Sequence, residues 1–194
     1  MPHRRRRRNP ACGLDGKAFF HTEVKIVDGD GNEVGPHTPG EVLVKGPHIM
    51  VGYWNRPDAT EESIVDGWLK TGDIAITDDE GFVYIQDRVK DMIISGGENV
   101  YPAEIENVIV GVPGVKETAV IGIASPKWGE SALAIVVKSD ESLTAEMVLA
   151  ECLAKLAKFK QPVGVEFIDE IPRNPTGKAL KRILREQFDT PAEV

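Results

Sequence analysis

The segment PRNPTGKALK, residues 172–181, combines residue types that can bind an anion. Gly177 allows a tight backbone turn, so the ammonium of Lys178 could project from a loop. From Arg173 to Arg185 the sequence contains five basic residues and no acidic one. The segment is not a Walker A loop, because alanine follows the lysine where that motif needs Ser or Thr. Two interpretations stay open, a phosphate contact and a solvated surface helix.

Two further segments contain residues that could contact a nucleotide. In GWLKTGD, Asp73 follows a Thr-Gly pair at a predicted strand start and could present its carboxylate to the hydroxyls of a ribose. The alternative is a turn aspartate that binds its own backbone. In DRVKDMIISGGENVYP, Gly96 and Gly97 permit close approach by a ligand, although they could also form a plain hairpin. Arg88, next to Asp87, could belong to a simple surface ion pair.

Composition limits the partners. The formal net charge of −8 argues against nucleic acid or an anionic membrane as a main partner. Cys12 and Cys152 are too few for a disulfide framework, and Cys152 falls on the apolar stripe of a predicted helix. We therefore expect a buried free thiol and a cytoplasmic protein. No apolar run approaches the roughly 20 residues of a transmembrane segment.

The first fifteen residues differ from the rest of the chain. Arg4–Arg8 form a basic run with no apolar segment after it, so we predict no signal peptide. Such a run could bind RNA or an acidic surface. We favour a leader over residues 1–15 that is unstructured or not native to the protein, because low-complexity runs bury little apolar area.

The remaining pattern changes character near residue 89. Before it, β-branched runs and acidic-glycine turns predict strands, including a hairpin over residues 24–34. After it, strands alternate with helices. Pro102 suits the first position of one helix and Thr144 the cap of another. The pattern therefore predicts an all-β segment followed by an α+β domain.

Four motifs together carry a family resemblance. GYWNRPDAT, GWLKTGDIA, DRVKDMIISGGENVYPAEIE and PRNPTGKALK occur in an order and spacing that resemble the C-terminal part of an AMP-forming acyl-CoA synthetase. The resemblance to this adenylate-forming superfamily extends from about residue 16 to residue 188. It implies an α+β fold class: a remnant of the large-domain β-barrel over residues 16–89, then the small C-terminal lid domain over residues 90–194.

The resemblance also implies a reaction and residue roles. ATP and a carboxylic acid would form an acyl-adenylate, from which coenzyme A would displace AMP. Asp73 would bind the ribose hydroxyls, Arg88 the ribose and phosphate region, and Lys90 would act as the hinge. Gly97 would line the pantetheine tunnel, and Lys178 would reach the α-phosphate and the carboxylate. The cofactors would be ATP or AMP, coenzyme A and Mg²⁺, and no metal site of the protein's own is expected.

Several motifs of that family do not occur in this sequence, namely the phosphate loop, the Tyr-Gly-x-Thr-Glu stretch and the acyl pocket. We therefore expect the C-terminal part of a fatty-acid–CoA synthetase that is inactive by itself. Two alternatives are a non-catalytic docking module and an adenylation lid that serves a carrier protein. Exposed edges of the β-barrel remnant also predict self-association.

Overall fold

The computed structural model describes residues 15–188, so the predicted leader up to residue 14 lies outside the described residues. The chain divides into two compact units, with the boundary between Lys90 and Asp91. Among residues 15–188, no helix is both long and apolar enough to cross a membrane.

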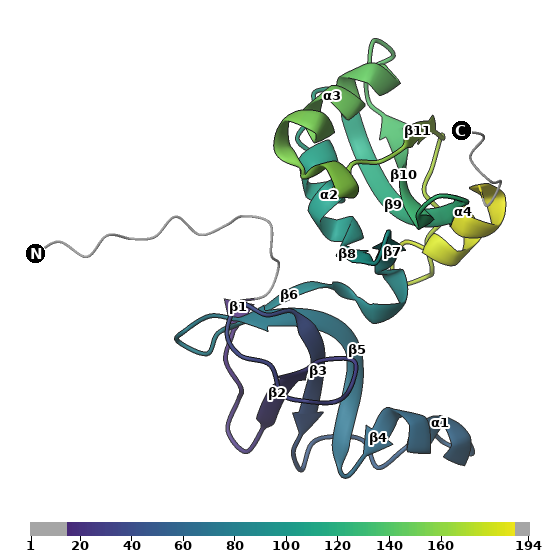
Figure 1. The fold of residues 1–194 in the computed structure, drawn as a ribbon. Coiled ribbons are helices and arrows are strands. Elements are labelled where there is room, and N and C mark those ends of the chain that lie inside the picture. Colours follow the sequence, from purple (N-terminus) through teal and green to yellow (C-terminus); the bar gives the residue numbers. More distant parts are fainter. Residues whose placement is uncertain (1–14, 189–194) are drawn as a thin grey trace, which may run out of the picture. The chain divides into compact units, whose positions relative to one another are not determined.

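The first unit is an antiparallel sheet of six strands, curled into a half-barrel (Figure 1). Its strands are β1 (Asp15–Gly16), β2 (Glu23–Val27), β3 (Gly40–Lys45), β4 (Ile64–Val65), β5 (Trp68–Thr77) and β6 (Val83–Arg88). The strand order is β1-β6-β5-β3-β2, and β4 pairs with β5. Ile26, Val42 and Ala75 form the buried core of this sheet. A short helix, α1 (Pro57–Ser63), precedes β4 and was not expected from the sequence.

Two aspartates organise the turns of this unit. The Asp28 carboxylate accepts hydrogen bonds from the backbone N–H groups of Asp30 and Asn32. Asp78 does the same for Glu80 and Phe82. These backbone donors hold the pKa of each aspartate below its usual range. The hairpin predicted over residues 24–34 is shorter than expected: its second strand is a single bridge from Val27 to Glu33, and β2 pairs with β3 instead.

The second unit alternates strands with helices. Its elements are η1 (Val89–Asp91, shared with the first unit), β7 (Ile93–Ser95), β8 (Glu98–Val100), α2 (Pro102–Ile109), β9 (Val115–Ser125), β10 (Gly129–Lys138), α3 (Ala145–Lys155), η2 (Lys158–Lys160), β11 (Gly164–Phe167) and α4 (Lys181–Phe188). β9 and β10 pair antiparallel, whereas β10 and β11 pair parallel. The parallel pair needs a crossover, which α3 supplies. The α+β prediction is confirmed.

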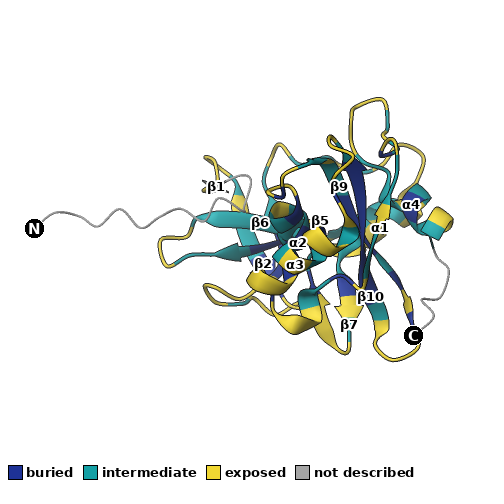
Figure 2. Ribbon diagram, turned by 90° about the horizontal axis from the view of Figure 1, so that it is seen from above, coloured by how far each residue is buried: buried dark blue, intermediate teal, exposed yellow. Residues whose placement is uncertain are grey.

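Apolar residues cover both faces of the β9–β10 pair, and Figure 2 shows these strands largely in the colour of buried residues. Even-numbered residues such as Val120 and Ala134 face the cluster that contains α2 and α3 residues. Odd-numbered residues such as Ile121 and Ile135 face the cluster that contains Leu184 of α4. This alternation places helices on both faces of the sheet, which explains why β10 reads as a continuous apolar run.

The predicted helix starts are confirmed. Pro102 occupies the first turn of α2, where its missing N–H costs nothing. The Thr144 hydroxyl accepts a hydrogen bond from the Met147 N–H and caps α3. Ile105 and Ile109 on α2 and Cys152 on α3 are fully enclosed, whereas Leu153, whose apolar side chain predicts a place on the inner face of α3, is 68% exposed.

Candidate functional site

Asp73 and Arg88 form a cross-strand pair in the first unit. They are opposite each other on β5 and β6, and Arg88 Nε donates to Asp73 Oδ1 over 2.8 Å. The Asp73 N–H donates to the Thr71 hydroxyl, which donates in turn to the Val42 carbonyl. Asp73 was expected at a strand start, but it lies inside β5, next to an irregularity in the β5–β6 register. The result is a half-buried carboxylate held in one orientation.

Lys90 lies in η1, at the last position of the first unit. Its side chain is exposed. The hinge role assigned to it stays a prediction.

Gly96 and Gly97 form the two-residue turn between β7 and β8. Their φ angles of 60° and 85° are both positive, as a type I′ hairpin turn requires. The Gly96 N–H donates to the Trp128 carbonyl over 2.8 Å. A Cβ on Gly96 would lie 2.9 Å from Cε3 of Trp128, whereas a Cβ on Gly97 would meet nothing within 4 Å. The indole therefore packs against Gly96, and Gly97 stays open to approach.

A cavity of about 490 Å³ lies beside this turn within the second unit. Its lining residues are Ser95, Gly96, Glu98, Lys127, Trp128, Ser131, Ala132, Lys158, Phe159, Gln161 and Val163. Trp128 and Phe159 are about half exposed, and Lys127 lies 4.8 Å from the centroid of the Trp128 ring. No salt bridge within residues 15–188 involves Lys127 or Lys158. Aromatic side chains and two lysines without a carboxylate partner in the described part of the chain thus share one concave surface, which the sequence indicates only through its two glycines.

Lys178 lies in a tight turn before α4. The Asn174 N–H donates a hydrogen bond to the Lys178 carbonyl over 2.9 Å, and Gly177 takes a positive φ of 85°. The Asn174 side chain accepts from the Lys178 N–H over 2.8 Å. The Lys178 side chain is exposed, so the turn presents an ammonium group to solvent.

The basic segment from residue 173 to residue 185 is less positive than its sequence indicates. Four of its five cations pair with carboxylates: Arg173 with Glu117, Lys181 with Glu106, Arg182 with Glu186, and Arg185 with Asp91. Among the salt bridges within residues 15–188, none involves Lys178. Among residues 15–188, Lys178 is therefore the one cation of this segment that forms no salt bridge with a carboxylate.

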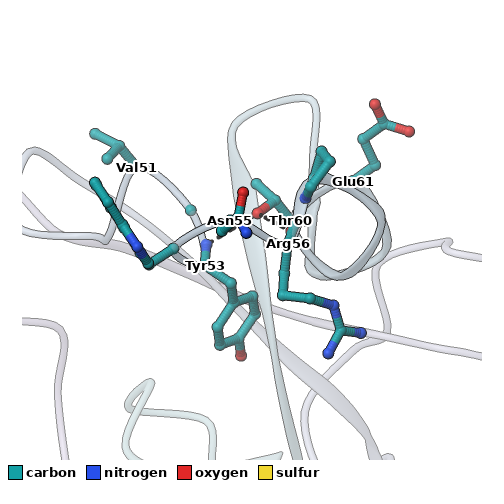
Figure 3. A pocket seen from close by; sticks show the side chains of 9 residues that line it. Val51, Tyr53, Asn55, Arg56, Thr60 and Glu61 are labelled. Carbon is teal, nitrogen blue, oxygen red and sulfur yellow. Dashed lines mark hydrogen bonds between the residues drawn. The ribbon is translucent and has the colours of Figure 1, made fainter.

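A second concavity, of about 510 Å³, lies in the first unit around residues 51–61. Figure 3 shows the Tyr53 and Arg56 side chains extending to one side and Glu61 to the other. Arg56 pairs with Asp58, and the Tyr53 N–H donates to the Thr60 hydroxyl. The segment GYWNRPDAT is thereby folded into a compact loop and helix start.

The comparisons identify the class of protein. Residues 104–178 match the AMP-binding enzyme C-terminal domain, and residues 1–54 match the AMP-binding enzyme family. The chain belongs to the AMP-binding enzyme family and represents its C-terminal portion, as the sequence predicted.

Its relatives are acid–CoA ligases. The chain is 53% identical, over 91% of its length, to the long-chain-fatty-acid–CoA ligase FadD13 of Mycobacterium tuberculosis, of which the match covers 35%. It is 54% identical, over 90% of its length, to an Escherichia coli long-chain-fatty-acid–CoA ligase, of which the match covers 31%. The ATP-bound structure of MatB from Rhodopseudomonas palustris is 40% identical, with a TM-score of 0.85 over 90% of this chain and 35% of that one. The chain thus spans about a third of these relatives.

Proposed function

We propose that this chain supplies the C-terminal part of an AMP-forming ligase that joins a fatty acid to coenzyme A. The observation that carries the proposal is Lys178, a lysine on a hydrogen-bonded turn that forms no salt bridge within residues 15–188, in a chain about half identical to two such ligases. In adenylation, its ammonium would stabilise negative charge on the α-phosphate and the acyl carboxylate as pyrophosphate leaves. Asp73 and Arg88 would hold the ribose, and rotation at Lys90 would withdraw the lysine afterwards.

The cavity beside Gly96 and Gly97 supports coenzyme A as the thiol acceptor, rather than a carrier protein. Trp128 and Phe159 can stack with an adenine ring, and Lys127 and Lys158 can pair with phosphates. Gly97 would leave room for the pantetheine arm. A carrier protein presents pantetheine without the nucleotide, so these four side chains would have no counterpart in it.

Mg²⁺ accompanies ATP in such reactions and is bound largely by the phosphates. Residues 15–188 contain no group of three His, Cys, Asp or Glu side chains that could hold a metal ion. We therefore assign no residue in this part of the chain to the ion, and no step to the ion itself. We place the protein in the cytoplasm, where the buried Cys152 thiol would stay reduced.

The test uses two proteins. We expect the 194-residue chain alone to show no ATP–pyrophosphate exchange with fatty acids, because the family's phosphate loop does not occur in its sequence. A hybrid of the preceding two thirds of the M. tuberculosis ligase with residues 16–194 should be active. In the hybrid, Lys178→Ala should abolish adenylation and preserve thioester formation from preformed acyl-adenylate, whereas Lys155→Ala should change neither. Equal loss of both half-reactions would refute the role of Lys178.

We also propose that the isolated chain self-associates through the first unit. Phe19, Phe20, Val51 and Trp54 are each at least 77% exposed there, and β2 is an edge strand of the sheet. Light scattering should show a mass that rises with concentration. A monomer throughout would exclude this association.

A further inference from the structure

Side-chain hydrogen bonds of Arg173 and Asn174 hold the turn that carries Lys178. Asn174 Oδ1 accepts three hydrogen bonds: from the Thr176 N–H over 3.1 Å, the Thr176 hydroxyl over 2.8 Å and the Lys178 N–H over 2.8 Å. One amide oxygen thus fixes the backbone on both sides of Gly177. The direction in which the Lys178 side chain leaves the turn depends on that backbone.

A second contact ties the turn to the central sheet. Arg173 Nη1 donates to the Gly177 carbonyl over 2.7 Å, and Arg173 Nη2 donates to Glu117 Oε2 over 2.8 Å. Glu117 lies on β9 and pairs with Val137 of β10, near one end of the β9–β10 ladder. One guanidinium therefore connects the tip of the turn to the strand pair that forms the core of the unit.

The same contact removes a competing charge. Arg173 lies in the same turn as Lys178 and, without a carboxylate, would offer a second cation to any anion bound there. Glu117 neutralises it through a charge-assisted hydrogen bond. Arg173 in turn keeps the pKa of Glu117 below its usual range, so Glu117 is ionised at neutral pH.

We propose that Asn174, Arg173 and Glu117 are positioning residues for Lys178. Asn174 fixes the backbone from which the lysine extends. Glu117 anchors Arg173 and keeps it from competing for the phosphate. The inference rests on the proposed role of Lys178 in adenylation, and its first test does not depend on that role.

The first test is amide hydrogen exchange by NMR in the 194-residue chain. Asn174→Ala should speed exchange of the Lys178 amide at least tenfold, because that N–H loses its acceptor. Asn174→Asp, which keeps an Oδ1 acceptor, should restore slow exchange. Arg182→Ala removes an ion pair of α4 outside the turn and should leave the Lys178 amide unchanged. Unchanged exchange in a folded Asn174→Ala chain would overturn the proposal.

The second test is adenylation in the hybrid ligase. Asn174→Ala and Glu117→Ala should each slow adenylation by about 10- to 100-fold, because a displacement of about 1 Å can cost about 100-fold in rate. Thioester formation from preformed acyl-adenylate should not change, and a loss of folding would lower both steps. If Lys178→Ala abolishes adenylation while Asn174→Ala and Glu117→Ala leave it intact, the positioning inference fails alone. If Lys178→Ala has no effect on adenylation, the proposed role of Lys178 is refuted, and with it the basis of the positioning inference.

Discussion

Replacing Gly96 by alanine should displace Trp128, whereas the same change at Gly97 should not. Both residues have positive φ angles, so alanine at either position costs roughly 1–2 kcal/mol of backbone strain. A less flexible unfolded chain offsets about 0.4–1 kcal/mol of that cost. We therefore expect each variant to lose about 1 kcal/mol of unfolding free energy from the backbone alone.

Only the alanine at position 96 meets another side chain. Its Cβ would lie 2.9 Å from Trp128 Cε3, and ordinary van der Waals contact begins at 3.4 Å. The indole must move outward by about 0.5 Å to restore that contact. Because Trp128 is half exposed, the movement should add about 1 kcal/mol, the lower end of the cost of overpacking.

The assay is ¹⁹F NMR on the chain labelled with 5-fluorotryptophan, together with urea unfolding. Trp128→Phe assigns the Trp128 resonance. That resonance should shift in Gly96→Ala and stay in place in Gly97→Ala, although both variants unfold at lower urea concentration. Equal shifts in the two variants, or none in Gly96→Ala, would refute the packing argument.

Three other predictions concern stability and reactivity. Thr144→Ala should lower the unfolding free energy by about 1 kcal/mol in urea titrations, because α3 loses its cap; no change would show that another group replaces the cap. Burial raises the pKa of the Cys152 thiol from 9.0 to about 11. In a Cys12→Ser chain, labelling of the Cys152 thiol at pH 8 should be far slower in the folded protein than in urea, and equal rates would contradict this burial. The free energy of unfolding should also fall as the pH rises from 9 to 11, because the unfolded chain loses the thiol proton first. Arg173 lowers the pKa of Glu117 from its ordinary 4.5, so the stability from this pair is present above pH 4.5 and lost as pH falls through the lowered pKa. Arg173→Met should therefore weaken the acid dependence of unfolding, and an unaltered dependence would count against the pair.

The elements best predicted from the sequence are those whose signals are local. Pro102 and Thr144 act through the first turn of their own helices, so each marks a helix start without reference to tertiary structure. The apolar run of β10 likewise follows from burial on both faces. Strand partners were harder to predict, because β2 has both a hairpin partner nearby and a longer partner in β3, and the longer pairing wins.

In the candidate site, too, the features set by local sequence were predictable and those set by distant residues were not. The residue types of Lys178 and Gly177 indicate an exposed cation on a turn, and the structure has that arrangement. The neutralisation of Arg173 and Lys181 depends on Glu117 and Glu106, which lie more than 50 residues earlier in the chain. Charge counting along one segment cannot include such partners. The packing of Trp128 on Gly96 is also tertiary and was not foreseen.

The placement of α4 has a consequence for biosynthesis. One face of the β9–β10 pair is covered by Leu184, which follows every strand of this unit in the sequence. During translation, the face that contains Ile121 and Ile135 cannot be fully covered until α4 has left the ribosome. Because the Lys178 turn is synthesised just before α4, this unit cannot complete its core without also possessing the lysine. A nascent chain arrested before α4 would expose part of this apolar face, which favours aggregation and recognition by chaperones and proteases.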